Sequence, residues 1–187
     1  MSIKKTFIGL TVVVLIAGFI AGCMPWKPVP EGKMVYERRM ESQKITLTSK
    51  LIIPESSRNY QITPVGVKIP IGPLFTENVP VALKEVIKDV STSSATTVDV
   101  IITAQLDNFS LSMSGIFPVI NATATYELST NDGRSVIKLT SVQSYKSSFN
   151  SPSGAELYKE VIWLCLEDLN SQLIAQKSII ASKIKGN

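Results

Sequence analysis

The 187-residue chain is predicted to fold as an α+β domain, with an antiparallel sheet of about four strands and two helices packed on one of its faces. Three observations predict this class. Several runs alternate apolar and polar residues, as half-buried strands do. Two longer segments repeat apolar residues every three or four positions, which is typical of amphipathic helices. Along the chain the order is strand, helix, three strands, helix.

The first strand is expected from residue 44 onward and to end at Pro54, which cannot continue a central strand. Four apolar residues define one of its faces: Ile45, Leu47, Leu51 and Ile53. Ser49 is a polar gap in this row. Residues 55–75 carry three prolines and two glycines, so we expect loop and short extended pieces, with an edge hairpin around 65–71 as one option.

A helix is predicted over residues 76–90, with Thr76 as N-cap and Pro80 in the first turn. Its apolar stripe consists of Val79, Leu83, Val86, Ile87 and Val90. Polar residues 91–97 then connect this helix to the next strand.

The three remaining strands are expected to form an antiparallel unit. The first covers residues 98–106. Its apolar residues stand mainly at even positions up to 106 and at odd positions from 109, which predicts a bulge near Asp107-Asn108. Residues 115–118 turn the chain into a strand over 120–128. Asn131-Asp132-Gly133 is a hairpin turn, because these residues tolerate positive φ, and the partner strand covers 136–145.

The second helix is predicted over residues 155–177, after a turn at Ser151-Pro152-Ser153-Gly154. One face carries apolar residues at spacings of three and four: Tyr158, Ile162, Cys165, Leu166, Leu169 and Leu173. Further apolar residues widen this surface, so the helix is either deeply covered or partly available to a partner.

The N-terminus has the pattern of a secretory signal peptide. Lys4 and Lys5 precede sixteen uncharged residues, 7–22, which is short for a membrane-spanning helix. Ile20-Ala21-Gly22-Cys23 resembles the bacterial lipobox, in which the cysteine thiol receives a diacylglycerol and the chain is cut before it. An uncleaved anchor with an incidental cysteine is the alternative. We expect Cys23 to be the lipid attachment site.

Three parts of the chain follow from this interpretation. Residues 1–22 are the signal peptide, residues 23–43 are the lipidated cysteine and a proline-rich tether, and residues 44–187 are a single α+β domain. Met24 follows the cysteine. In enterobacterial lipoproteins an aspartate at that position means inner-membrane retention, so the resemblance implies the outer membrane, with the domain facing the periplasm.

The element order on a lipidated N-terminus resembles a loose group of bacterial envelope lipoproteins. These include the YajG-type family, the lipopolysaccharide-assembly lipoprotein and the auxiliary lipoproteins of ABC transporters. The resemblance is carried by these segments: Ile52-Ile53-Pro54 leading to Arg58-Asn59-Tyr60, the helix at 81–90, the strands at 98–106 and 120–128, and the final helix. It implies an accessory, non-catalytic role.

The residue inventory gives little support to an enzyme. The chain has no histidine and only two cysteines, so neither the usual zinc sites nor the commonest general base is available. Ser135-Val136-Ile137-Lys138 matches a Ser-x-x-Lys pattern, but Ser135 is expected to begin a strand and not a helix. Cys165 is expected to be a buried, inert thiol. We therefore expect no catalytic residues, no metal site and no cofactor beyond the covalent lipid.

The net charge is +4, and Lys4 and Lys5 supply two of these charges, which is too little for a nucleic-acid-binding surface. The expected partners are the membrane, through the lipid, and another envelope protein. The sequence thus predicts an outer-membrane-anchored adaptor or assembly factor for an envelope transport or biogenesis complex. A carrier of lipid or another apolar ligand is the alternative.

Overall fold

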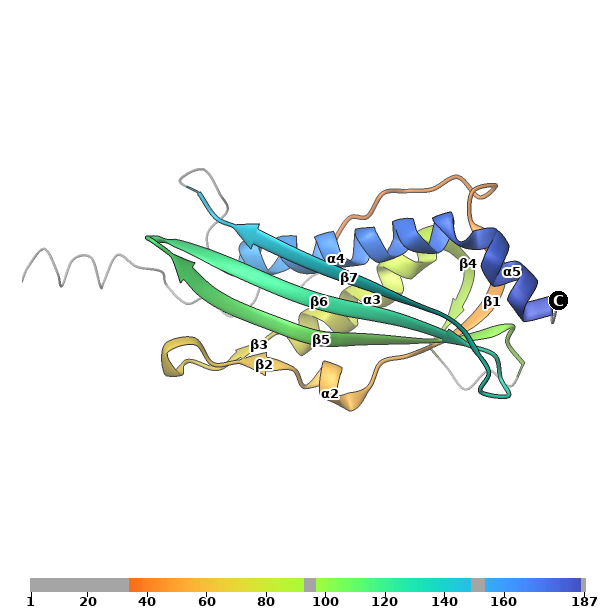
Figure 1. Cartoon of the computed structure of the whole chain (residues 1–187), viewed down its shortest axis with the longest axis horizontal. Coiled ribbons are helices and arrows are strands. Elements are labelled where there is room, and N and C mark those ends of the chain that lie inside the picture. The colour runs from red at the N-terminus through yellow and green to blue at the C-terminus, as the bar shows by residue number, and fades with distance from the viewer. Residues whose placement is uncertain (1–33, 93–96, 149–153, 186–187) are drawn as a thin grey trace, which may run out of the picture.

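The structure is a computed structural model that describes residues 34–92, 97–148 and 154–185 (Figure 1). The strands are β1 Ile45–Ile52, β2 Gln61–Ile62, β3 Ile69–Pro70, β4 Ile87–Ser91, β5 Val100–Ser114, β6 Phe117–Ser129 and β7 Ser135–Lys146. The helices are α2 Glu55–Arg58, α3 Gly72–Val86, α4 Ala155–Ala175 and α5 Lys177–Lys185, with a 3₁₀ turn at Pro64–Gly66. The α+β class is confirmed.

The main sheet has five strands in the order β4-β1-β5-β6-β7, so the prediction of about four antiparallel strands is wrong in detail. β1 pairs in parallel with both β4 and β5, and only β5, β6 and β7 are antiparallel neighbours. The parallel pairing has a physical reason. The chain between β1 and β4 contains helix α3, and a helical crossover returns the chain in the same direction.

Helix α3 corrects the predicted helix at both ends. It begins at Gly72, where Pro73 occupies the first turn, so Pro80 lies in its interior. It ends at Val86, because Ile87 is extended and begins the edge strand β4. Ile87 and Val90 were predicted to belong to the apolar face of the helix. They lie instead on strand β4, because these residues pair with β1.

The order and antiparallel pairing of β5, β6 and β7 are confirmed, but β5 extends to Ser114 and β6 begins at Phe117, within the predicted turn at 115–118. The register between β5 and β6 shifts between Leu106 and Asn108, at the position where a bulge was expected. The 131–133 turn joins β6 to β7, and Gly133 has a positive φ of 83°. Ser49, the polar gap in the first strand, is buried, and its hydroxyl donates a hydrogen bond to the Asp89 carbonyl across the parallel pair at 3.0 Å.

The predicted loop over 55–75 contains the short helix α2 and the β2–β3 hairpin, which begins earlier than the predicted 65–71. This segment covers the edge of β5 beyond the end of β1. The amide of Leu106 donates to the Ser57 hydroxyl at 3.0 Å, and the amide of Phe109 donates to the Tyr60 hydroxyl at 2.9 Å. Gly72 is required here, since a Cβ would lie 2.1 Å from the Arg58 carbonyl oxygen.

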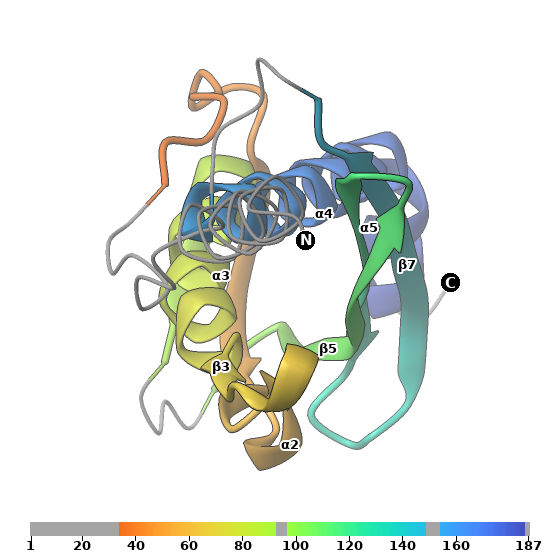
Figure 2. The same ribbon diagram turned by 90° about the vertical axis from the view of Figure 1, so that its left-hand side faces the viewer.

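Helices α3 and α4 pack against each other, and α4 lies over β6 and β7 (Figures 1 and 2). The whole predicted apolar face of α4 is buried. It rests on small inward side chains of the central strands, Ala122 and Ala124, which are also buried. The predicted helix over 155–177 ends at Ala175, and α5 follows as a separate helix, so four helices replace the predicted two in the described parts of the chain.

The signal peptide, Cys23 and the tether up to residue 33 lie outside the described residues, as does most of the turn at 151–154. Within the ranges that the structure describes, no helix is long and apolar enough to cross a bilayer.

Leu166→Ala should lower the free energy of unfolding by about 2–5 kcal/mol, because Leu166 is fully buried between α4 and the sheet and its truncation leaves a cavity. Leu164→Ala is a matched control on the same helix, where the side chain is only partly buried. Urea denaturation of both variants measures the difference. Equal losses would mean that the buried face of α4 is assigned wrongly.

Candidate functional site

Residues 34–37, here called the strap, run along the outer side of α4. Three hydrogen bonds hold them. The Met34 amide donates to Asn78 Oδ1 at 2.7 Å, the Trp163 indole Nε1 donates to the Val35 carbonyl at 2.9 Å, and the Glu37 amide donates to Glu167 Oε1 at 2.7 Å. These residues, which fall within the range expected as tether, are therefore fixed to both α3 and α4.

Tyr36 is the side chain that secures the strap to the core. It is buried, whereas its neighbour Val35 is 90% exposed, so the strap alternates inward and outward as an extended chain does. Burial and, secondarily, the nearby Glu167 carboxylate raise the pKa of Tyr36 well above its usual value. The phenol therefore stays neutral at physiological pH, which is compatible with its apolar surroundings.

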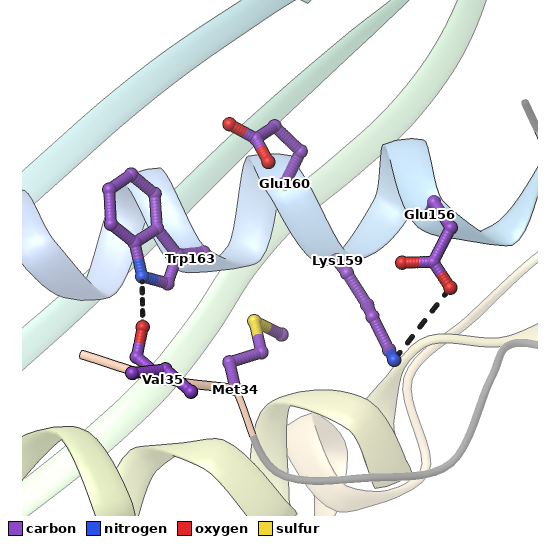
Figure 3. A pocket seen from close by; sticks show the side chains of 6 residues that line it. All are labelled: Met34, Val35, Glu156, Lys159, Glu160 and Trp163. Atoms are coloured by element: carbon purple, nitrogen blue, oxygen red, sulfur yellow. Dashed lines mark hydrogen bonds and ion pairs between the residues drawn. The ribbon is translucent and has the colours of Figure 1, made fainter. Parts of the chain in front are cut away.

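A shallow surface pocket of about 370 Å³ lies between the strap and the first half of α4 (Figure 3). Its lining residues are Met34, Val35, Glu156, Lys159, Glu160 and Trp163. The Lys159 ammonium lies 3.8 Å from the Glu156 carboxylate, an exposed ion pair of small energetic weight. The lining combines the apolar side chains of Met34, Val35 and Trp163 with the charged side chains of Glu156, Lys159 and Glu160.

A second pocket of about 380 Å³ continues along the same side of α4. It is lined by Glu37, Gln143, Trp163, Leu164, Glu167, Asp168 and Ser171. Trp163 separates the two pockets, and carboxylates outnumber the cation Lys159 along this side of the helix. The outer side of α4 is thus a mainly acidic surface around one indole ring, here called the α4 outer surface.

The predicted site residues are placed as follows. Cys23 lies outside the described residues, so its lipidation stays a prediction. Cys165 is fully buried, as expected, and burial raises the pKa of its thiol to about 12. Ser135 begins strand β7, as expected, and is exposed. Across the parts of the chain that the structure describes, no three metal-ligating side chains come together.

Sequence reasoning missed the strap, because residues 34–37 fall within the range expected as tether. One pattern points to it afterwards. Met34 and Tyr36 are apolar residues two apart, separated by the exposed Val35, directly before a charged run. In the sequence, so short a segment cannot be told apart from the end of the tether. Its hydrogen bonds to Asn78 and Glu167 are what show that it belongs to the folded domain.

No protein-family model matches the chain, and a comparison with curated proteins gives no match. Among solved structures, the chain is similar to protein XCC0632 from Xanthomonas campestris, described with the family DUF330, with a TM-score of 0.56 and 13% identity over 84% of this chain and 100% of that one. This likeness shows the fold.

Looser similarities include a minor lipoprotein from Acinetobacter baumannii, with a TM-score of 0.35 and 15% identity over 73% of this chain and 92% of that one. Rare lipoprotein B from Shewanella oneidensis has a TM-score of 0.33 and 10% identity over 74% of this chain and 97% of that one.

Trp163→Phe should loosen the strap while preserving an aromatic ring at this position. It removes the indole donor to Val35, and a net loss of about 0.5–1.5 kcal/mol corresponds to roughly two- to thirteenfold more frequent opening. Tryptic cleavage at Arg38 and Arg39, next to the strap, measures this. Glu156→Gln is the control, since Glu156 lines the same pocket but pairs with Lys159. Cleavage at the wild-type rate in Trp163→Phe would contradict the role of the indole.

Proposed function

We propose that this protein is a lipid-anchored envelope lipoprotein that acts as a non-catalytic adaptor, presenting the α4 outer surface to a protein of an envelope transport or biogenesis complex. The observation that carries the proposal is the strap. It connects the segment that follows Cys23 directly to the surface formed by Trp163 and the carboxylates of α4. Ten residues, 24–33, lie between the proposed anchor and this surface in the sequence.

The lipobox at Ile20-Ala21-Gly22-Cys23 supports the anchor. Two or three acyl chains, each contributing about 0.8 kcal/mol per buried methylene, hold a protein at a bilayer firmly. Met24 at the following position supports the outer membrane, with the domain facing the periplasm. Confinement to a membrane raises the effective concentration of the α4 outer surface toward membrane-bound partners, so weak contacts suffice.

The packing of α4 favours an adaptor over a carrier of apolar ligands. A carrier would need part of the apolar face of α4 for its ligand, and that face is completely buried against the sheet and α3. What α4 offers to solvent is instead a shallow, charged surface with a single tryptophan. Tryptophan in such a setting is a frequent centre of binding energy between proteins.

Cys23→Ala should abolish acylation and leave an uncut precursor, because the thiol is the atom that receives the lipid. Metabolic labelling with a fatty-acid probe measures it. Cys165→Ala is the matched control and should label as the wild type does, since the Cys165 thiol is buried. Equal labelling of Cys23→Ala and wild type would contradict the lipoprotein interpretation.

A photo-crosslinking residue in place of Lys159 should trap one defined envelope protein in living cells, because Lys159 lines the pocket beside the strap. Lys138 is the control position, exposed on strand β7. Mass spectrometry of the adduct identifies the partner. Adducts that are unspecific, or equal at both positions, would contradict an adaptor that uses the α4 outer surface.

A further inference from the structure

The β5–β6 hairpin projects beyond the N-terminal end of α4 and forms one end of the long axis, opposite α5 (Figure 1). The core-facing row of β5 continues into this projection. Phe109 is buried, Leu111 is partly buried, and Met113 is 64% exposed. The exposure rises along the row because the described helices end before the strands do. At the turn, Ile116 is 72% exposed.

The hairpin tip, residues 111–119, carries no charge. No charged residue occurs in the sequence between Asp107 and Glu127. The cation that the neighbouring strand brings to this end is Lys146, which pairs opposite Val119. Such a tip is suited to contact a bilayer. Its insertion does not require a charged group to be desolvated, and the nearby Lys146 ammonium attracts anionic headgroups.

The backbone of the tip is compatible with the membrane interface. β5 and β6 pair continuously from Asn108 with Thr123 to Ser114 with Phe117, and a turn of two residues closes the hairpin. In a regular hairpin, the backbone N–H and C=O groups that face the partner strand hydrogen-bond to it. An irregular loop leaves such groups without these partners.

The anchor can bring this tip to a membrane. Ten residues, 24–33, separate Cys23 from Met34, and an extended chain of that length reaches about 33 Å. The Phe109 and Tyr158 rings stack edge to face at 5.8 Å, which places these two residues at the same level. From that level the tip extends about 20 Å along β5, and Trp163, which binds the strap, lies about 8 Å back along α4.

We propose that the β5–β6 hairpin tip inserts Met113 and Ile116 into the interfacial region of the bilayer that holds the lipid anchor. This second contact would fix the orientation of the domain on the membrane. It would direct the long axis toward the bilayer and leave the α4 outer surface on the side of the molecule. The inference rests on the lipid anchor of the proposed function.

The test uses Met113→Cys and Ile116→Cys in the mature acylated protein that begins at Cys23, each labelled with an environment-sensitive fluorophore. The native cysteines do not interfere, because Cys23 carries lipid and Cys165 is buried with a raised pKa. The protein is reconstituted into vesicles of phosphatidylethanolamine and phosphatidylglycerol that contain nitroxide-labelled acyl chains. Val142→Cys is the matched control, 71% exposed on β7 and paired with Thr123, far from the turn.

Both tip labels should be quenched by the nitroxide chains and shifted to the blue relative to the Val142 label. Adding Ile116→Glu should abolish the quenching at position 113, because a carboxylate opposes insertion. Tip labels that are quenched no more than the Val142 label in acylated protein would overturn the inference, including the case in which the tip serves a protein partner instead. Absent acylation, measured by mass on the same samples, would count against the proposed anchor itself.

Discussion

Small side chains at inward positions of β6 and β7 allow helix α4 to lie close to the sheet. Ala122 and Ala124 on β6 are fully buried there, as is Ser141 on β7. The Cys165 sulfur consequently lies only 3.8 Å from the Ala122 carbonyl oxygen. Larger residues at these positions would lift α4 and open voids, which closely packed interiors do not tolerate. The position of α4 in turn fixes α3, since the Asn170 side-chain amide donates to the Ala82 carbonyl at 2.9 Å.

The same helix serves two purposes on two sides. Its apolar face forms the core with the sheet, and its outer side receives the strap through Trp163 and Glu167. The N-terminal segment is therefore docked on a helix whose apolar face is fully packed in the core. The hairpin tip adds a second contact at one end of the same axis.

The sequence predicted the elements with local patterns and missed those that depend on pairing between distant segments. The bulge after Leu106, the turn at 131–133 and the buried face of α4 followed from periodicity and turn residues. The strand at Ile87–Ser91 did not, because its apolar spacing also fits a helix and only β1 selects the extended form. The docking of the strap could likewise not be predicted from the sequence, because its hydrogen-bond partners Asn78, Trp163 and Glu167 lie far along the chain.

The docking of the N-terminal segment on α4 is the central claim, and hydrogen exchange of the strap amides tests it most directly. The Met34 and Glu37 amides donate to Asn78 and Glu167, each at 2.7 Å. Site-resolved mass spectrometry should show both amides exchanging much more slowly than an unstructured chain of the same sequence. Exchange at the unstructured rate would contradict the claim, because residues 34–37 would then not be held against α3 and α4.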